Sequence, residues 1–440
     1  MIQRFIRRVF GLRSNHMERV PREKHGLSRD ALSPAASKVC TVLREAGFSA
    51  YVVGGAVRDL LLGIEPKDFD VATDARPEQV KPLFRRALII GRRFRLVHVM
   101  LGAETVEVST FRAADPDTAE KDEHGRVLRD NVFGTQAEDA RRRDFTVNAL
   151  YFDPATEEVV DFHGGLTDLK KRVMRVIGEP ETRFREDPVR MLRAVRLAAK
   201  LGLTLDSATR EPIRRLAPLM ERVPPARLFD EMLKLLLSGH ASACLRQLRE
   251  VGLHKGLLPL LDVILEQPLG ERFVTLALAQ TDERVLADRP VSPAFLFAAL
   301  LWHEVLAAWR GRETRGERSI PALENAMDEV LDTQCAKLAI TRKLTATMRE
   351  VWSMQPRFEG RSGQRPYRLI EAPRFRMAYD FLALRAASGE VPADLEAWWR
   401  GFAAADAEVR KAMLLPDTGP RKRRRRRRKK RPAAQPPAQA

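Results

Sequence analysis

The segment from Tyr51 to Ala72, YVVGGAVRDLLLGIEPKDFDVA, constrains the fold of this 440-residue chain more than any other feature. Its pattern predicts a strand, a glycine turn, a helix, a second turn and a second strand that carries Asp68 and Asp70. Successive side chains of a strand point to opposite faces, so both carboxylates are expected on one face and Phe69 on the other.

Two adjacent carboxylates repel each other unless a positive charge lies between them. Mg²⁺ prefers carboxylate and phosphate oxygens and is the usual neutralising ion. The preceding Gly54 and Gly55 allow a tight turn at a helix start, where free N–H groups attract an anion. A pair of acids two residues apart is by itself often an exposed turn, but its place after a strand, a glycine turn and a helix favours a metal site. The segment therefore predicts phosphoryl or nucleotidyl transfer.

A net charge of +18 indicates a polyanionic partner. The run Arg421–Arg431 supplies 11 consecutive positive charges, and the rest of the chain still carries +7. Nucleic acid fits the phosphate chemistry better than a membrane surface does. The three cysteines lie far apart in the sequence, which argues against a disulfide framework and favours the cytoplasm. No apolar stretch reaches transmembrane length.

Periodic patterns divide the chain into five parts. Strand patterns alternate with short helices up to about residue 178, and helical periodicity follows. We therefore expect an α+β fold, in which a small mixed-sheet head precedes an all-helical neck and body. The expected parts are a disordered basic arm (1–33), the head (34–178), a neck that binds nucleotide or RNA (179–240), a helical body (241–415) and a disordered basic tail (416–440).

A second cluster, RRRDFTVN, precedes another predicted strand. Arginines at such a position can simply be solvated. Together, however, Arg143 can bind phosphate, while Asp144 and Asn148 can bind ribose hydroxyls. Asp144 is alternatively a third carboxylate beside the metal. Glu107, in the strand VEVST, competes for that role or is an outward-facing strand residue.

A third segment, REDPVRMLRAVR, opens the predicted neck. Asp187, which precedes a proline, is typical of a helix N-cap. Arg190, Arg193 and Arg196 recur every three residues and share one broad helical face. Such a stripe usually faces solvent, but here it directly follows the head and is a candidate nucleotide-binding face. An acid and a base one turn apart can also read the edge of a nucleobase.

Two further basic segments are candidates for RNA contact. One is the loop GRRFR, which is either plain surface or a flexible phosphate contact, and the other is the terminal run. A charge run is usually solvated and disordered, but its density implies salt-dependent, sequence-independent affinity for nucleic acid. The candidate residues are Arg92, Arg93, Arg95, Arg421, Arg423, Arg428 and Arg431.

The chain resembles the class II nucleotidyltransferases of the polymerase-beta superfamily, which include bacterial poly(A) polymerases and tRNA CCA-adding enzymes. The resemblance covers residues from about 34 to 240 and is carried, in order, by GGAVRDLLLG, PKDFDVAT, RRDFTVNAL and REDPVRMLRAVRLAAKLG. It implies two catalytic Mg²⁺ ions held by Asp68 and Asp70, and a place for Asp144 in the active site. The residues it implies for the triphosphate are Gly54, Gly55 and Arg58, and those for the base are Asp187 and Arg190.

Within this family, GRRFRLVHVM, RDNVFG, PPARLFDEMLKLL and the basic tail look like the bacterial poly(A) polymerase group. This likeness implies template-independent transfer of AMP from ATP to RNA 3′ ends by a two-metal mechanism. The alternatives are CCA addition to tRNA and, from another class, a non-catalytic RNA-binding protein. The sequence leaves open the selectivity for ATP over CTP and any protein partners in RNA degradation or RNA chaperoning.

Overall fold

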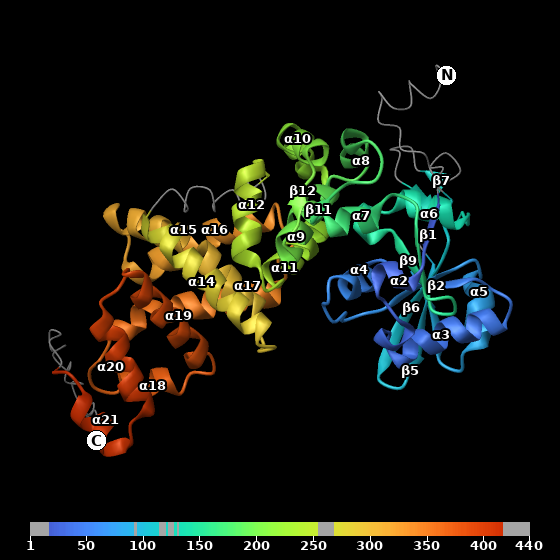
Figure 1. The fold of residues 1–440 in the computed structure, drawn as a ribbon. Helices are drawn as coiled ribbons and strands as arrows, with labels where there is room; N and C mark the ends of the chain where they lie inside the picture. Colours follow the sequence, from blue (N-terminus) through green and yellow to red (C-terminus); the bar gives the residue numbers. More distant parts are fainter. Residues whose placement is uncertain are drawn as a thin grey trace, which may run out of the picture. The chain divides into compact units, whose positions relative to one another are not determined.

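A computed structural model of the chain describes residues 17–91, 95–113, 120–121, 127–129, 132–253 and 268–416. These residues fall into two compact units that divide between Thr345 and Ala346. The strands gather in the blue and cyan part of the ribbon, and the chain from green to red is almost entirely helical (Figure 1). The expected α+β architecture is therefore confirmed. None of the helices among the described residues combines the length and the apolar character needed to cross a bilayer.

The head contains a mixed eight-stranded sheet with the order β1-β10-β9-β2-β3-β6-β5-β4. The β3 and β6 strands are parallel, and every other neighbouring pair is antiparallel. The strands are β1 (Glu18–Val20), β2 (Ala50–Val53), β3 (Asp70–Thr73), β4 (Ala87–Ile90), β5 (Leu96–Leu101), β6 (Glu104–Thr110), β9 (Leu150–Asp153) and β10 (Glu158–Asp161). Two small pairs stand apart, β7 (Glu120–Lys121) with β8 (Val127–Arg129), and β11 (Val173–Met174) with β12 (Thr204–Leu205).

Both faces of the central strands are covered. Every residue of β2 and β9 is buried, which requires packing on each side of the sheet. The amphipathic helix α3 (Pro34–Glu45) contacts β2, β3 and β6 from one side. Ala140 of α6 (Gln136–Arg142) joins Tyr51, Phe111 and Tyr151 in an apolar cluster. The head is thus a rigid platform for residues at its strand ends.

Strand pairing brings three distant segments to one end of this platform. The antiparallel register of β2 and β3 places Val53 opposite Asp70, so the glycine turn after β2 lies beside the start of β3. The parallel register of β3 and β6 places Asp70 beside Glu107. The following helix, α4 (Gly55–Leu61), contacts β2 and β9 and fixes the direction in which the chain leaves the turn.

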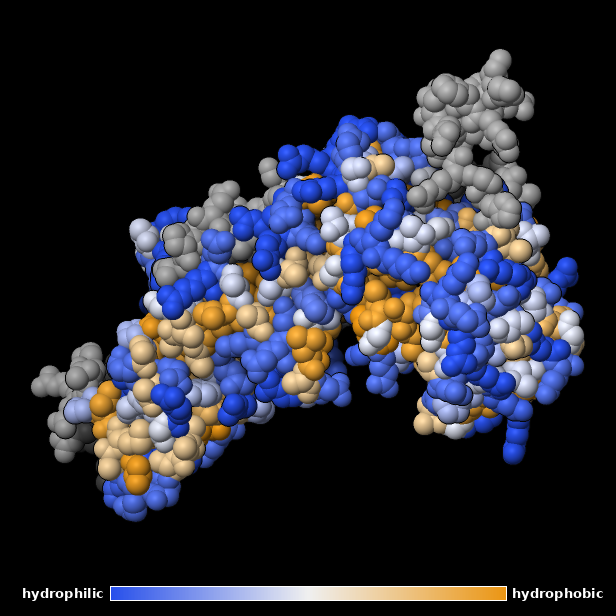
Figure 2. Space-filling model, in the orientation of Figure 1, coloured by the Kyte–Doolittle hydropathy of each residue, from blue (hydrophilic) through white to orange (hydrophobic). Residues whose placement is uncertain are grey.

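Helices make up most of the remaining described chain. In the first unit they are α2 (Arg22–His25), α5 (Pro77–Val80), α7 (Gly165–Lys170), α8 (Pro180–Glu186), α9 (Val189–Leu201), α10 (Ser207–Leu216), α11 (Pro225–Leu236), α12 (Ala241–Val251), α14 (Pro268–Leu286), α15 (Pro293–Thr314) and α16 (Ser319–Cys335). The helix α17 (Arg342–Met354) leads into the second unit, which contains the 3-10 helix η6 (Gln355–Glu359), α18 (Arg365–Ile370), α19 (Phe375–Ser388), α20 (Ala393–Ala404) and α21 (Ala407–Met413). Figure 2 shows a face on which hydrophilic residues predominate and apolar residues form limited patches.

The expectation of a disordered arm at 1–33 is wrong for residues 17–33. The β1 strand pairs with β10 and forms one edge of the sheet, and Val20, Leu27 and Leu32 are buried. Ion pairs of Arg19 with Glu158 and of Arg22 with Glu157 hold the segment in place. The polar composition of this segment gives no strand pattern. The strand forms because the neighbouring strand supplies partners for its backbone hydrogen bonds. Residues 1–16 and 417–440 lie outside the described part.

The expected boundary between a neck and a body at residue 240 does not divide compact units. The α12 helix packs against α9, and α14 packs against α12 and α15, so these helices continue the first unit up to Thr345. Helical periodicity predicted the individual helices, but it carries no information about which apolar faces meet.

Candidate active site

The centre of the candidate site is a group of three carboxylates at one end of the head sheet. Asp70 opens β3, but Asp68 lies two residues earlier, outside the strand, so the prediction that one strand carries both carboxylates is wrong for Asp68. Glu107 is the neighbour of Asp70 on the parallel strand β6 and exposes 44% of its side chain. His98 Nε2 lies 3.6 Å from its carboxylate. The strand register therefore adds Glu107 to the pair that the sequence predicted.

Asp70 carries the electrostatic signature of this group. The pKa of its carboxyl is raised from 3.8 to about 6. Reduced hydration by surrounding protein atoms is the largest cause, followed by the charge of Glu107, and Asp68 adds to the effect. Arg143 acts in the opposite direction, but the net shift remains upward. A divalent cation bound beside Asp70 would favour its ionised form.

The glycine turn lies beside these acids and depends on glycine. Gly54 has φ 78° and ψ −129°, a conformation that side chains rarely permit. A Cβ atom at Gly54 would lie 3.2 Å from Arg143 Nη1, so there is little room beneath the turn. No side chain caps the first turn of α4. The backbone of Gly54 and Gly55 is therefore the surface that this turn offers to a ligand.

Arg143 lies under the turn as part of a buried network. Its Nε donates to the Tyr151 hydroxyl at 3.1 Å, and its Nη2 lies 3.3 Å from Asp139 Oδ2. The Tyr151 hydroxyl in turn donates to the same Asp139 oxygen at 2.6 Å. Burial lowers the pKa of Arg143, but Tyr151 and Asp139 more than compensate, and the net shift is upward. This arginine supports the turn from inside.

Arg58 is also an interior residue. Its side chain is 6% exposed, and its Nε and Nη2 donate to Asp59 Oδ1 at 2.8 and 2.6 Å. Its Nη1 donates to Asn148 Oδ1 at 2.5 Å, and Asn148 donates to Asp144 Oδ1 at 3.0 Å. The expected direct contact between Arg58 and a triphosphate does not match this position, because the guanidinium is buried and engaged with protein atoms. Asn148 is likewise occupied by its two protein partners.

Asp144 connects the head to the neck. Arg193 of α9 donates to Asp144 Oδ2 from Nε and Nη2, at 2.9 and 2.6 Å. Burial alone would raise the pKa of Asp144, but Arg193, the Asn148 amide and the Phe145 N–H hold it below its usual value. Both carboxylate oxygens thus have protein partners, in contrast to Glu107.

The arginine stripe of α9 is directed into the protein, as its place after the head suggested. Arg193 and Arg196 approach Glu231 of α11, at 3.7 and 3.5 Å, and Lys234 Nζ lies 3.1 Å from the same carboxylate. Sequence reasoning missed Glu231. It lies among the buried apolar positions of α11, and a charged residue at such a position is a detectable signal of a partner. A continuous polar network therefore runs from Arg58 to Glu231.

Asp187 and Arg190 lie near this network but have different partners. Asp187 is not the N-cap of α9, because Pro188 precedes the helix and Asp187 ends α8. Asp187 Oδ2 accepts a hydrogen bond from Arg227 at 2.7 Å, while its buried Oδ1 has no hydrogen-bond partner among the described residues. Arg190 Nη1 donates to the Arg183 carbonyl and to Glu186 Oε2, at 2.8 and 3.0 Å.

The predicted RNA contacts lie mostly outside the described residues. Arg92 and Arg93 fall in the gap after residue 91, and Arg421, Arg423, Arg428 and Arg431 fall after residue 416. Arg95 is described and forms an ion pair with Glu78. The structure therefore assigns a partner only to Arg95 in this set.

Three family descriptions match the chain. "Poly A polymerase head domain" matches residues 50–175, "Probable RNA and SrmB- binding site of polymerase A" matches 202–265, and "Polymerase A arginine-rich C-terminus" matches 315–432. The first of these spans every strand of the head sheet except β1. The three descriptions follow the order of head, neck and C-terminal region.

Comparison with individual known proteins also indicates the poly(A) polymerase family. Poly(A) polymerase I of Salmonella typhi is 46% identical over 423 residues, which cover 93% of this chain and 91% of that protein. The CCA-adding enzyme of Lactobacillus helveticus is 39% identical over 208 residues, covering 47% of this chain and 50% of that protein. The solved CCA-adding enzyme of Bacillus stearothermophilus in complex with CTP has a TM-score of 0.56 and 27% identity, covering 84% of this chain and 81% of that one. The chain belongs to the poly(A) polymerase family of nucleotidyltransferases.

Proposed function

We propose that this chain adds AMP from ATP to RNA 3′ ends without a template and releases pyrophosphate. The observation that carries the proposal is the carboxylate group of Asp68, Asp70 and Glu107 beside the glycine turn. It lies in a chain that resembles poly(A) polymerase I along 93% of its length. The likeness to CCA-adding enzymes covers 47% of the chain, so it supports the chemistry of the head more than CCA addition. This activity belongs in the cytoplasm.

The three carboxylates fit a site for two Mg²⁺ ions. They are hard oxygen donors at one sheet end, and the pKa of Asp70 is raised first by reduced hydration and then by the charge of Glu107, both of which a bound cation would oppose. Within the described part of the chain, no group of three or more His, Cys, Asp and Glu side chains is placed to hold a metal ion by itself, so substrate phosphates and water would have to supply most of the ligands of Mg²⁺ bound at these acids. When bound, Mg²⁺ would lower the pKa of the RNA 3′-hydroxyl and stabilise charge on the phosphates.

The other residues position the substrates. The backbone of Gly54 and Gly55 would face the triphosphate, with Arg143 and Arg58 fixing the turn from below. Asp144 and Arg193 would hold the neck against the head, so that the base-binding groups of the neck keep a constant distance from the acids. In this proposal Asp144 and Arg58 are positioning residues, and Glu107 is the third metal-side carboxylate.

Asp187 and Arg190 are suited to the edge of adenine. Asp187 Oδ1 is an unused acceptor, which matches the exocyclic amino group of adenine. Arg190 is a donor three residues away, which matches a ring nitrogen acceptor. Arg190 is also paired with an acid, but that acid, Glu186, is 46% exposed. The partners of Arg193 and Arg196 are only 12% and 7% exposed, so these two arginines would act by positioning the helix.

We expect Arg190→Ala to raise the KM for ATP about tenfold, which corresponds to the loss of one hydrogen bond to a charged group, and to reduce the preference over CTP. Steady-state transfer with all four nucleotides checks this. Arg185→Ala is the matched control, because Arg185 is an exposed neck arginine bonded to Glu181. Equal kinetics for both variants would leave Arg190 without a role in base selection.

The decisive test of the proposed function is Mg²⁺-dependent incorporation of labelled ATP into a generic RNA. Activity with ATP and little activity with CTP supports polyadenylation. Preferential use of CTP on a tRNA that lacks its terminal CCA would instead support CCA addition. Binding of RNA without any transfer would support the non-catalytic alternative.

We expect a chain that ends at Pro416 to keep its transfer rate at saturating RNA but to bind RNA more weakly. The run Arg421–Arg431 has no carboxylate or nucleophile, yet it can neutralise several phosphates. A plot of log affinity against log salt should lose about 0.7 in slope for each phosphate contact removed. Identical slopes for both lengths would show that the tail does not touch RNA.

A further inference from the structure

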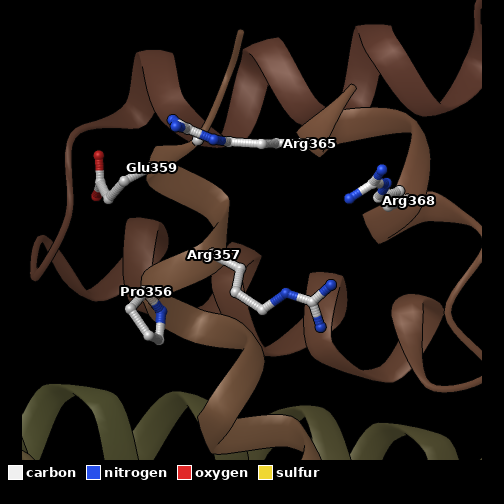
Figure 3. Close-up of a pocket in the computed structure, with 6 residues that line it drawn as sticks. Pro356, Arg357, Glu359, Arg365 and Arg368 are labelled. Carbon is white, nitrogen blue, oxygen red and sulfur yellow. The ribbon is translucent and has the colours of Figure 1, made fainter. Parts of the chain in front are cut away.

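The second compact unit contains a cavity of about 470 Å³ that is lined by Pro356, Arg357, Glu359, Gly360, Arg365 and Arg368. Figure 3 shows the side chains of Arg357 and Arg368 extending toward the same side of the cavity, while Arg365 extends toward Glu359. Three of the six lining residues are arginines, so the cavity is rich in positive charge.

The scaffold under these arginines is firmly packed. Phe358, next to Arg357, is fully buried, and its carbonyl accepts a hydrogen bond from Trp399 Nε1 at 2.8 Å. In α18, Pro366 and Leu369 are buried on the inner face. Arg365 and Arg368, three residues apart, therefore emerge together on the outer face. The three guanidinium groups project from two fixed elements, η6 and α18, and not from a loop.

The charge of the cavity is unbalanced. Among the described residues, none of the three arginines has an acidic partner within 4.0 Å, and Glu359 is the single acid in the lining. Other arginines of this unit are paired, as Arg374 is with Glu350, Arg376 with Asp380 and Arg400 with Glu396. Because unpaired like charges repel each other, an anion beside Arg357 and Arg368 would be stabilised by both groups and, at longer range, by Arg365.

We propose that this cavity binds a phosphodiester group of the RNA substrate, an inference that rests on the proposed function. Guanidinium groups match the oxygens of a phosphate in a bidentate manner. The six lining residues include no aromatic ring on which a base could stack, so the cavity offers recognition of the backbone and not of a nucleotide. RNA held here would be retained without regard to its sequence, which suits an enzyme that elongates many different 3′ ends.

The test uses the full chain with Arg357, Arg365 and Arg368 all changed to alanine. Anisotropy of a fluorescent single-stranded oligoadenylate should show about tenfold weaker binding, and the salt slope should be shallower by about 0.7 for one lost phosphate contact. The KM for ATP and the rate at saturating RNA should not change. A second variant, in which all three arginines are changed to lysine, keeps the charge but cannot form bidentate hydrogen bonds to a phosphate. Its loss of RNA affinity should be intermediate.

The matched control removes the same charge from the same unit, by changing Arg374, Arg376 and Arg400 to alanine. An equal loss of affinity in both alanine variants, or full affinity in the lysine variant, would show that net charge alone matters and would overturn the proposal. A raised KM for ATP with unchanged RNA affinity would also overturn it, in favour of a nucleotide pocket. A melting temperature equal to that of the unaltered chain verifies that each variant is folded. Absence of transfer by the unaltered chain would refute the proposed function, while the binding comparison remains informative about the cavity.

Discussion

Asp70→Asn is expected to lower the rate of AMP transfer at least about 1000-fold, because it removes a charged oxygen ligand from the site proposed for Mg²⁺. Asp68→Asn should have a comparable effect. Both changes are nearly isosteric, so neither disturbs packing. Single-turnover incorporation of labelled ATP measures the loss. Rates within about tenfold of the unaltered chain for both variants would remove this pair from the mechanism.

The stability of the Asp70 variant provides an independent readout. The folded-state pKa of Asp70 is about 6, above its ordinary 3.8, so the folded state holds this proton more tightly than the unfolded state does. The contribution of Asp70 to stability is therefore fully present below about pH 4 and lost as the pH rises through about 6. At pH 7.5 without divalent ions, Asp70→Asn should be at least as stable as the unaltered chain.

With Mg²⁺ present, the unaltered chain should become more stable than the Asp70→Asn variant. An ion that binds the folded state alone raises the melting temperature by mass action, and the unaltered chain should respond while the Asp70 variant does not. Asp74→Asn is the matched control, because Asp74 follows the other end of β3 and its side chain accepts a hydrogen bond from the Ser49 backbone N–H. An equal Mg²⁺ response in all three proteins would place the ion elsewhere.

Glu107→Gln and Asp144→Asn are expected to fail in different ways. Glu107 is partly exposed and lies beside Asp70, so its change should lower transfer at least about 100-fold with little effect on stability. Asp144 is bonded to Arg193 and Asn148, so its change should cost about 2 kcal/mol of unfolding free energy by weakening a partly buried ion pair.

Denaturant unfolding together with single-turnover transfer separates these outcomes. Glu104→Gln is the control for Glu107, since Glu104 is an exposed acid at the start of the same strand. A stable but inactive Asp144→Asn protein beside an active Glu107→Gln protein would assign the third metal-side carboxylate to Asp144. The pKa of Asp144 is depressed, so its contribution to stability should be present near neutral pH and lost as the pH falls through that depressed value.

Local sequence patterns determined the elements of the site with good accuracy. The strand Ala50–Val53 and the helix α4 after the glycine turn occur as expected, because alternation and helical spacing depend on which face is buried. The pair of Asp68 and Asp70 and the adjacent glycine turn were also evident, since their chemistry lies within one short segment. The ordered residues 17–33 were missed, because their partners in β10 lie far away in the sequence.

Tertiary structure alone decided the roles of residues whose partners are distant. Glu107 and Asp144 were equivalent candidates in the sequence, and they separated only when the parallel pairing of β3 with β6 put one beside Asp70 and the packing of α9 put the other against Arg193. Arg58 is an arginine beside a glycine turn in sequence, but a buried support in space. A charged side chain acts on a substrate or on the protein according to what surrounds it, and those surroundings arise from contacts that local patterns do not encode.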